Sequence, residues 1–382
     1  MATENFLVEL GTEELPPTAL KKLSDAFTAG VEAGLTDAGI SFGDVTSYAA
    51  PRRLAITIEA LQTEQEDKEE TLYGPPAKIA FDADGQPTKA AEGFASRAGA
   101  TAADLQTAPD SHGKNAGKLM IQRTIKGKQT SELLGDIVQN SLDKLPIPKR
   151  MRWGASRVEF VRPVQWLVML LGNTVVDAEV LGLKAGNTSR GHRFHAPGEV
   201  TIAEPLAYQE TLRGAYVMTS FAERSALIKE QVTAEGKKLG GEAIIDDDLL
   251  DEVTALNEWP VALAGSFDED FLRIPPEALV SSMKEHQKYF HVMKDGKLLP
   301  NFITVSNIES KDPAQVISGN EKVIRPRLAD AAFFWDTDRK QKLESRFEKL
   351  ENVVWVNKLG SIADKARRIS ALATRIAGET GG

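Results

Sequence analysis

The first sixty residues show two different patterns of apolar and polar positions, one typical of strands and one typical of a helix. An apolar run at 5–10 predicts a strand, and apolar positions three or four residues apart over 18–37 predict an amphipathic helix. Residues 45–48 and 54–61 predict two further strands, the second because apolar and polar positions alternate along it. This order predicts a small α/β unit with an antiparallel sheet, which the strongly apolar run at 160–171 can complete. The helix prediction depends on Leu20, Leu23, Phe27, Val31 and Leu35.

The stretch 62–148 differs from the first sixty residues in being rich in acidic and turn-forming residues. It opens with the acidic run 63–70, and turn residues follow at 74–76 and 82–85. We interpret this stretch as an insertion in the first α/β unit. The elements predicted within it are a short helix at 90–97, a strand at 118–125 and a helix at 129–142.

Short strands and helices alternate in the next part of the chain, and from residue 312 onward the pattern is mostly helical. A turn is predicted at 294–297, a helix end at 353–359 and an amphipathic helix at 361–377. The pattern as a whole predicts a multidomain α+β fold with small mixed or antiparallel sheets, packed helices and a helical end. The other predicted elements are strands at 200–202, 243–245, 260–265, 289–293 and 302–305, and helices at 222–239 and 249–256.

Composition narrows the class of protein. A chain of 382 residues is too long for one ordinary core, and 42% hydrophobic with 26% charged residues is typical of soluble globular proteins. No apolar run approaches the roughly 20 residues that span a bilayer, and no secretory signal pattern opens the chain. The absence of cysteine excludes disulfides, thiolate catalysis and cysteine-bound metals. We therefore expect a cytoplasmic protein with no membrane partner.

The charge is uneven. The net charge of −9 is unusual for a nucleic-acid binder, but residues 149–162 hold five basic side chains against one acid, Glu159. Because salt screens distant charges, a local basic strip can bind RNA on an acidic protein. The five basic residues are Lys149, Arg150, Arg152, Arg157 and Arg162.

Six short blocks occur in a fixed order along nearly the whole chain. They are FLVELGTEELPP at 6–17, APRRLA at 50–55, KRMRWG at 149–154, SRGHRFHAP at 189–197, NEWP at 257–260 and PRLADAAFF at 326–334. Each block is short, but six in order are specific. Together they resemble the beta subunit of bacterial glycyl-tRNA synthetase, a glycine–tRNA ligase of the aminoacyl-tRNA synthetase class that serves protein biosynthesis.

The resemblance implies a division of labour. In that family an alpha subunit forms the adenylate and holds ATP, Mg²⁺ and glycine, while the beta subunit binds tRNA(Gly) within an alpha2–beta2 tetramer. The chain has no phosphate-binding Gly-x-x-x-x-Gly-Lys loop, no dinucleotide motif and no class II arginine motif, which agrees with this division. We therefore expect no catalytic residue, no cofactor site and no metal site in this chain, which alone should be inactive.

The resemblance also implies a domain order. Residues 1–61 with 149–195 are expected to form the N-terminal α/β unit, and 62–148 the inserted domain. Residues 196–335 resemble the B3/B4 region of the phenylalanyl-tRNA synthetase beta subunit. Residues 336–382 should begin a helical HD-like domain. The chain would then be the N-terminal portion of the subunit, a little over half of it, without the anticodon-binding domain and without anticodon contact.

Eleven residues are candidates for RNA contact. Adjacent arginines can grip phosphates, and basic residues beside an aromatic can combine phosphate neutralisation with base stacking. Each group also has a structural interpretation: only one residue of an adjacent pair in a strand faces a ligand, and Trp153 can anchor the insertion to the core. The candidates are Arg52, Arg53, Lys149, Arg150, Arg152, Trp153, Arg190, Arg193, Lys322, Arg325 and Arg327.

Further interpretations stay open for the later motifs. The loop of Arg190 and Arg193 suits phosphate or ribose contact, or internal pairing with Glu199 or Glu204. His192 and His195 lack a third ligand of suitable spacing, which argues against a metal. The basic cluster of Lys322, Arg325 and Arg327 can face tRNA, a neighbouring domain or the partner subunit. The aromatic residues that follow it, Phe333, Phe334 and Trp335, are expected in the core.

Two other functions compete with tRNA positioning. Ser281, Ser282 and His286 allow an autonomous editing hydrolase, although no glycine elbow surrounds either serine. Glycine is also the smallest amino acid, so exclusion by size leaves little need for editing. The other alternative is a scaffold that only docks the alpha subunit and does not touch RNA.

Overall fold

The structure, a computed structural model, describes residues 2–82 and 85–381. Its contacts divide the chain into a first unit, Met1–Arg224 with Thr254–Trp259, and a second unit, Ser225–Val253 with Pro260–Gly382. Several small antiparallel sheets with packed helices confirm the predicted α+β class. The predicted domain boundaries at 61, 148, 195 and 335 stay predictions. Part of the turn predicted at 82–85 and the last residue of the chain lie outside the described residues.

A five-stranded antiparallel sheet forms the centre of the first unit, with the order β10-β9-β1-β3-β2. Its middle strand β1 pairs with β3 on one side and β9 on the other, so that Val8 lies opposite Ile56 and Met169. The sheet confirms the strands predicted at 5–10, 45–48 and 54–61 and the completing strand within 160–171. The strands are β1 (Thr3–Thr12), β2 (Val45–Ala50), β3 (Arg53–Gln62), β9 (Val164–Leu171) and β10 (Thr174–Val175).

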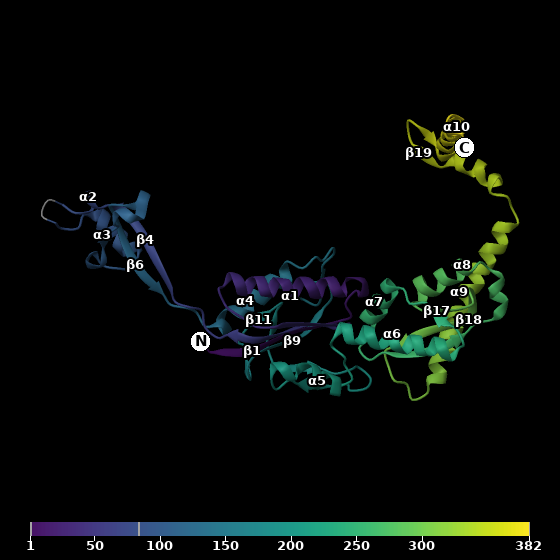
Figure 1. Cartoon of the computed structure of the whole chain (residues 1–382), viewed down its shortest axis with the longest axis horizontal. Coiled ribbons are helices and arrows are strands. Elements are labelled where there is room, and N and C mark those ends of the chain that lie inside the picture. The colour runs from purple at the N-terminus through teal and green to yellow at the C-terminus, as the bar shows by residue number, and fades with distance from the viewer. Residues whose placement is uncertain (1, 83–84, 382) are drawn as a thin grey trace. The chain divides into compact units, whose positions relative to one another are not determined.

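Helices cover both faces of this sheet (Figure 1). Because side chains alternate along β1, Val8 packs with α1 (Leu20–Asp37) and α4 (Thr130–Asp143). Its neighbour Leu7 packs on the other face with Tyr208 and Leu212 of α5 (Tyr208–Gly214). We had placed the helix at 129–142 in the insertion, but Leu134, Val138 and Leu142 of α4 belong to the first core.

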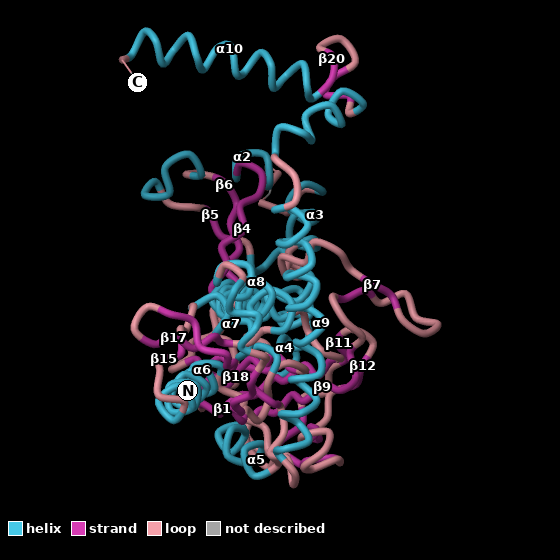
Figure 2. Tube along the Cα trace, turned by 90° about the vertical axis from the view of Figure 1, so that its right-hand side faces the viewer, coloured by secondary structure: helices cyan, strands magenta, loops and turns pink. Residues whose placement is uncertain are grey.

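The insertion has a small core of its own. A three-stranded sheet, β4-β6-β5, packs against α3 through Phe94, Leu119 and Ile121, and β4 and β6 run side by side in both views (Figures 1 and 2). The two ends of the insertion meet at its base: Gln65 N donates to Lys128 O at 2.9 Å, and Thr130 N donates to Thr63 O at 2.8 Å. Its elements are β4 (Lys68–Pro76), α2 (Ala77–Ala80), α3 (Lys89–Arg97), β5 (Gln106–Thr107) and β6 (Lys118–Ile125).

The second unit has a four-stranded antiparallel sheet with the order β15-β17-β18-β16. Ile303 of β18 packs on the face covered by α6 and α7, and its neighbour Phe302 packs on the face covered by α8 and α9. The predicted turn at 294–297 joins β17 to β18, with φ of 49° at Asp295 and 74° at Gly296. The elements are α6 (Phe221–Lys238), β15 (Glu242–Ala243), α7 (Asp247–Leu256), β16 (Val261–Ser266), α8 (Pro276–Ser281), β17 (Phe290–Lys294), β18 (Lys297–Ser306) and α9 (Pro313–Arg339).

The last forty residues form a small hairpin and a helix. The helix end predicted at 353–359 is wrong, because β19 (Val354–Val356) pairs with β20 (Gly360–Ser361), as its β-branched valines favour. The amphipathic helix predicted at 361–377 is confirmed as α10 (Ile362–Thr380), the long helix near the C-terminus in Figure 2. Ser361 and Asp364 form a capping box at its start. None of the described helices is both long and apolar enough to cross a membrane.

Candidate nucleic-acid interface

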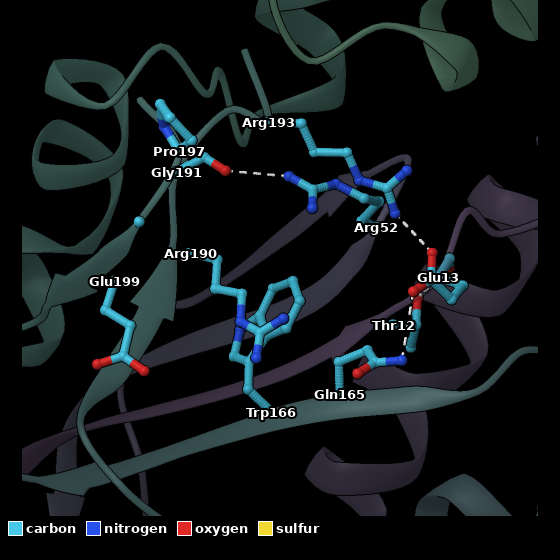
Figure 3. A pocket seen from close by; sticks show the side chains of 11 residues that line it. Thr12, Glu13, Arg52, Gln165, Trp166, Arg190, Gly191, Arg193, Pro197 and Glu199 are labelled. Carbon is cyan, nitrogen blue, oxygen red and sulfur yellow. Dashed lines mark hydrogen bonds and ion pairs between the residues drawn. The ribbon is translucent and has the colours of Figure 1, made fainter. Parts of the chain in front are cut away.

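A polar cavity of about 470 Å³ lies where the loop between β13 (Thr188–Arg190) and β14 (Glu199–Thr201) meets the end of β1 (Figure 3). Three arginines and two glutamates contribute to its wall. The lining residues are Thr12, Glu13, Arg52, Gln165, Trp166, Arg190, Gly191, Arg193, Pro197, Gly198 and Glu199. The cavity thus joins three of the sequence blocks, at 6–17, 50–55 and 189–197, that lie far apart along the chain.

The adjacent arginines at 52 and 53 are buried. Arg53 has no exposed surface and Arg52 is 6% exposed. Arg53 Nη1 donates to Glu9 Oε1 at 2.9 Å, and its Nη2 donates to Glu258 Oε1 at 3.2 Å. Arg52 Nη2 donates to the other oxygen of Glu258 at 3.1 Å. We therefore withdraw Arg52 and Arg53 as RNA contacts, because their guanidinium groups are committed to carboxylates inside the first unit.

The same two arginines hold the cavity loop. Arg53 Nη2 donates to the carbonyl oxygen of Arg190 at 2.9 Å, and Arg52 Nη2 donates to that of Gly191 at 3.0 Å. His192 strengthens the turn, since its Nδ1 accepts from the backbone N–H groups of Phe194 and His195, both at 3.2 Å. Four hydrogen bonds thus fix the loop over residues 190–195, and Arg52 and Arg53 act as positioning residues.

Charges inside this cluster support one another. Burial alone would raise the pKa of Glu258, but Arg53 and Arg52 outweigh burial and hold that pKa below its ordinary value. Burial would lower the pKa of Arg53, but Glu9 and Glu258 outweigh it and raise the pKa. Glu258 and Arg53 therefore stay ionised within a buried network, in which loss of one partner leaves an uncompensated charge.

A third buried arginine, Arg224, escaped the sequence analysis. Its guanidinium donates to the carbonyl oxygens of Ala49 at 2.5 Å and Met218 at 2.6 Å, and burial lowers its pKa to about 9. One signal could have found it: Arg224 lies four and eight residues before the buried Ile228 and Val232 on the apolar face of the predicted helix. Glu9 gave a similar signal as the single acid within an apolar strand.

The exposed arginines of the cavity have different partners from those we expected. Arg193 Nη2 donates to Glu13 Oε2 at 2.5 Å and also lies near Glu14, rather than near Glu199 or Glu204. Arg190 forms no ion pair among the described residues, and its guanidinium carbon lies 5.3 Å from the centroid of Trp166 (Figure 3). Arg190 therefore keeps an exposed charge at the cavity wall.

Trp166 forms the floor beneath Arg190. Its ring packs directly over Gly11, where an added Cβ would lie 1.8 Å from the ring. The same ring lies 5.4 Å from the guanidinium carbon of Arg53. In the sequence, Trp166 stands out only as part of an apolar run, and Gly11 only as part of a family block. Their contact explains why a side chain is excluded at position 11.

The basic loop at 149–153 partly fits both of its interpretations. Trp153 packs against the first core, as its structural interpretation requires. Arg150 donates to the carbonyl oxygen of Asp143 at 2.7 Å, and Arg152 forms an exposed ion pair with Glu159 at 2.5 Å. Lys149 is exposed and has no carboxylate partner among the described residues. Beside this loop lies an open cavity of about 620 Å³, lined by Arg150, Arg152 and Arg157 together with three acids.

The basic cluster of the second unit lies on α9. Lys322, Arg325 and Arg327 are all exposed and form no ion pair among the described residues. We expected the aromatic residues after them in the core, and this is wrong for Phe333 and Phe334, each 64% exposed. Helical geometry explains the error: the core takes Ile324, Leu328 and Ala332, and residues 333 and 334 fall beyond that stripe. Trp335 is half-buried against that core, as expected.

The serines of the hydrolase alternative have no catalytic arrangement. Neither Ser281 nor Ser282 makes a hydrogen bond to His286 or His291 among the described residues. Lys284 forms an ion pair with Asp246 at 2.9 Å, and burial together with Lys284 lowers the pKa of His291. A serine nucleophile needs a base within hydrogen-bond reach, and none is placed here.

Comparison with known proteins gives one consistent result. Residues 6–381 match the family model described as glycyl-tRNA synthetase beta subunit. The chain is 58% identical over 381 residues to the glycine–tRNA ligase beta subunit of Marinobacter nauticus, covering 99% of the chain and 54% of that protein. It is 55% identical over 383 residues to the subunit of the same name from Stutzerimonas stutzeri, covering 100% of the chain and 55% of that protein. The chain thus spans about half the length of the curated relatives it matches.

Proposed function

The chain belongs to the glycyl-tRNA synthetase beta subunit family, and from that premise we propose that it positions tRNA(Gly) for aminoacylation. It would do so in the cytoplasm, within an alpha2–beta2 glycine–tRNA ligase. The alpha subunit would supply the ATP, Mg²⁺ and glycine sites, and this chain no adenylate site. The chemical step would then belong to the assembly, with this chain fixing the register of the RNA.

One observation carries the proposal. Five of the candidate cations, in a chain with a net charge of −9, are exposed and have no carboxylate partner among the described residues. Exposed cations that are not paired with a carboxylate are available to phosphate oxygens. The five residues are Lys149 and Arg190 in the first unit, and Lys322, Arg325 and Arg327 in the second.

The test is tRNA(Gly) binding by the chain over a series of salt concentrations. Each phosphate contact adds about 0.7–0.9 to the slope of log affinity against log salt, so a Lys149→Ala, Arg150→Ala, Arg152→Ala variant should flatten the slope by about 1–3. The matched control removes two exposed cations that are not among the candidates, Lys238 and Arg375, which pair with Glu235 and Glu379. The control should leave the slope within about 0.5 of the original.

Two results would contradict the proposal. Undetectable tRNA binding at low salt would favour the scaffold alternative, in which the chain only docks the alpha subunit. A slope identical in the triple variant and the control would remove the 149–152 loop from the interface. Deacylation of a mischarged tRNA by the chain, abolished by Ser282→Ala, would favour the hydrolase.

A further inference from the structure

Two opposite charges face each other across the β13–β14 ladder without pairing. Arg190 and Glu199 are direct partners in its register. Opposite charges at such positions normally stabilise each other through their side chains. Here neither side chain forms an ion pair among the described residues, and both stand at the cavity wall in Figure 3. Both residues line the cavity of about 470 Å³ and a neighbouring cavity of about 260 Å³.

These two charges are presented by a rigid backbone. The carbonyl groups of Arg190 and Gly191 each accept a hydrogen bond from a buried arginine, and the turn that follows closes on His192. A loop held in this way loses little conformational entropy when a ligand binds. The unpaired cation and the unpaired carboxylate therefore stand at fixed positions on one wall.

An exposed aromatic ring lies on the same loop. Phe194 is 74% exposed, although its neighbours Gly191, Arg193 and Pro197 line the cavity. Its ring centroid lies 6.1 Å from that of the buried His192, so the loop supports the ring from beneath while its outer side stays open. An exposed aromatic beside arginines is the combination that binds unpaired bases by stacking.

We propose that this cavity binds one unpaired ribonucleotide of an RNA chain. The Arg190 guanidinium holds the phosphate, the Glu199 carboxylate accepts a hydrogen bond from the ribose 2′-hydroxyl, and the base stacks on Phe194. This inference rests on the proposed tRNA function and specifies which part of the RNA the first unit recognises. A free amino acid would leave most of a 470 Å³ space empty.

The choice between RNA and DNA gives the sharpest test. DNA lacks the 2′-hydroxyl that Glu199 would accept, so discrimination between the two sugars depends on that carboxylate. The probes are a fluorescent single-stranded RNA hexanucleotide, its DNA equivalent and whole tRNA(Gly), and the readout is anisotropy with the full 382-residue chain. The chain should bind the RNA hexamer about tenfold more tightly than the DNA hexamer.

Three variants separate the contacts. Glu199→Gln should reduce the RNA preference to less than about threefold. Arg190→Ala and Phe194→Ala should weaken both hexamers about tenfold, because phosphate and base are common to both. Glu204→Gln, which changes another exposed carboxylate of the same region, is the control and should match the wild-type chain. All four side chains are exposed or unpaired, and a thermal melt checks that each variant folds.

The outcomes distinguish the nucleotide site in this cavity from the broader proposal that the chain positions tRNA(Gly). If tRNA(Gly) binds but the RNA hexamer does not, or if Arg190→Ala and Glu199→Gln leave hexamer binding unchanged, the cavity assignment is overturned while tRNA positioning stands. If neither RNA binds, both proposals fail. Loss of hexamer binding in Arg190→Ala together with loss of sugar preference in Glu199→Gln supports the cavity.

Discussion

Two arginine-rich segments of the first unit, at 52–53 and at 190–193, have similar chemistry and opposite surroundings. Arg53 is fully buried between Glu9 and Glu258, whereas Arg190 is exposed and unpaired over Trp166. The buried pair donates hydrogen bonds to the backbone of the exposed segment. The buried arginines therefore hold the exposed segment in place. The comparison teaches that burial beside carboxylates makes an arginine structural, whereas an arginine at the surface stays available even with a glutamate opposite it in the ladder.

The largest expected effect is on stability, and it follows from substitution of the buried Arg53. Arg53→Met would leave Glu9 and Glu258 buried without their main partner, and breaking a buried pair costs about 3–5 kcal/mol. Chemical denaturation should show this loss in the free energy of unfolding. Arg193→Met breaks only an exposed ion pair with Glu13 and should cost less than about 1 kcal/mol. Equal losses in the two variants would remove the distinction between the segments.

The next effect concerns the floor of the cavity. A Cβ at position 11 would lie 1.8 Å from the Trp166 ring, so Gly11→Ala should displace the ring and destabilise the first unit by about 1–3 kcal/mol. The displacement should also appear as a change in tryptophan fluorescence. Gly93→Ala is the opposite control, because its Cβ meets nothing within 4 Å in helix α3 and should stabilise slightly. A Gly11→Ala chain as stable as the wild type would show that Trp166 has room to move.

A smaller effect should appear in acid. The pKa of Glu258 in the folded chain lies below its ordinary value of 4.5, so the unfolded chain binds more protons in this range. The stabilisation is complete above about pH 4.5 and is lost as pH falls through the folded pKa. Unfolding free energy measured from pH 6 downward should fall more steeply in the wild type than in Glu258→Gln. Parallel curves would mean that Glu258 does not titrate within the cluster.

The smallest effect on stability is expected in the basic loop at 149–153. Arg152→Ala breaks an exposed ion pair with Glu159, a change that costs less than about 1 kcal/mol. The same change should still weaken tRNA(Gly) binding at low salt, since one phosphate contact would be lost. Binding measured beside a thermal melt separates the two. A variant that loses stability without losing tRNA affinity would place Arg152 with the buried arginines as a structural residue.

Local pattern was enough to predict most of the fold. Strand β3 and the helices α1 and α10 follow from periods of 2.0 and 3.6 residues, and β1 and β9 follow from short apolar runs. The assignment of α4 to the insertion failed for another reason: an amphipathic helix shows that it has a partner but does not say which core provides it.

The candidate site was harder to predict. From the sequence, Arg190 and Arg193 are candidate RNA contacts and Glu199 is one of two candidate partners for them. Glu13, Gln165 and Trp166 are not singled out, because they meet these residues at the cavity only after folding. Sequence reasoning also treated Arg52 and Arg53 as surface groups, because their carboxylate partners lie 44 and 206 residues away along the chain. The prediction for Phe333 and Phe334 was wrong in the opposite way, because they were expected in the core and are exposed. Hydrophobic character alone does not fix which side of a helix is buried.

The base of the insertion has a consequence for the history of this chain. Residues 63 and 130 are joined by a backbone hydrogen bond, and residues 65 and 128 by another, so the segment leaves and re-enters the first unit at one point. The segment also has its own core around Phe94. A single genetic event can therefore add, remove or exchange residues 64–129 and leave a gap that a tight turn closes. Among related chains, this segment should vary in length and sequence while the sheet beneath it is conserved.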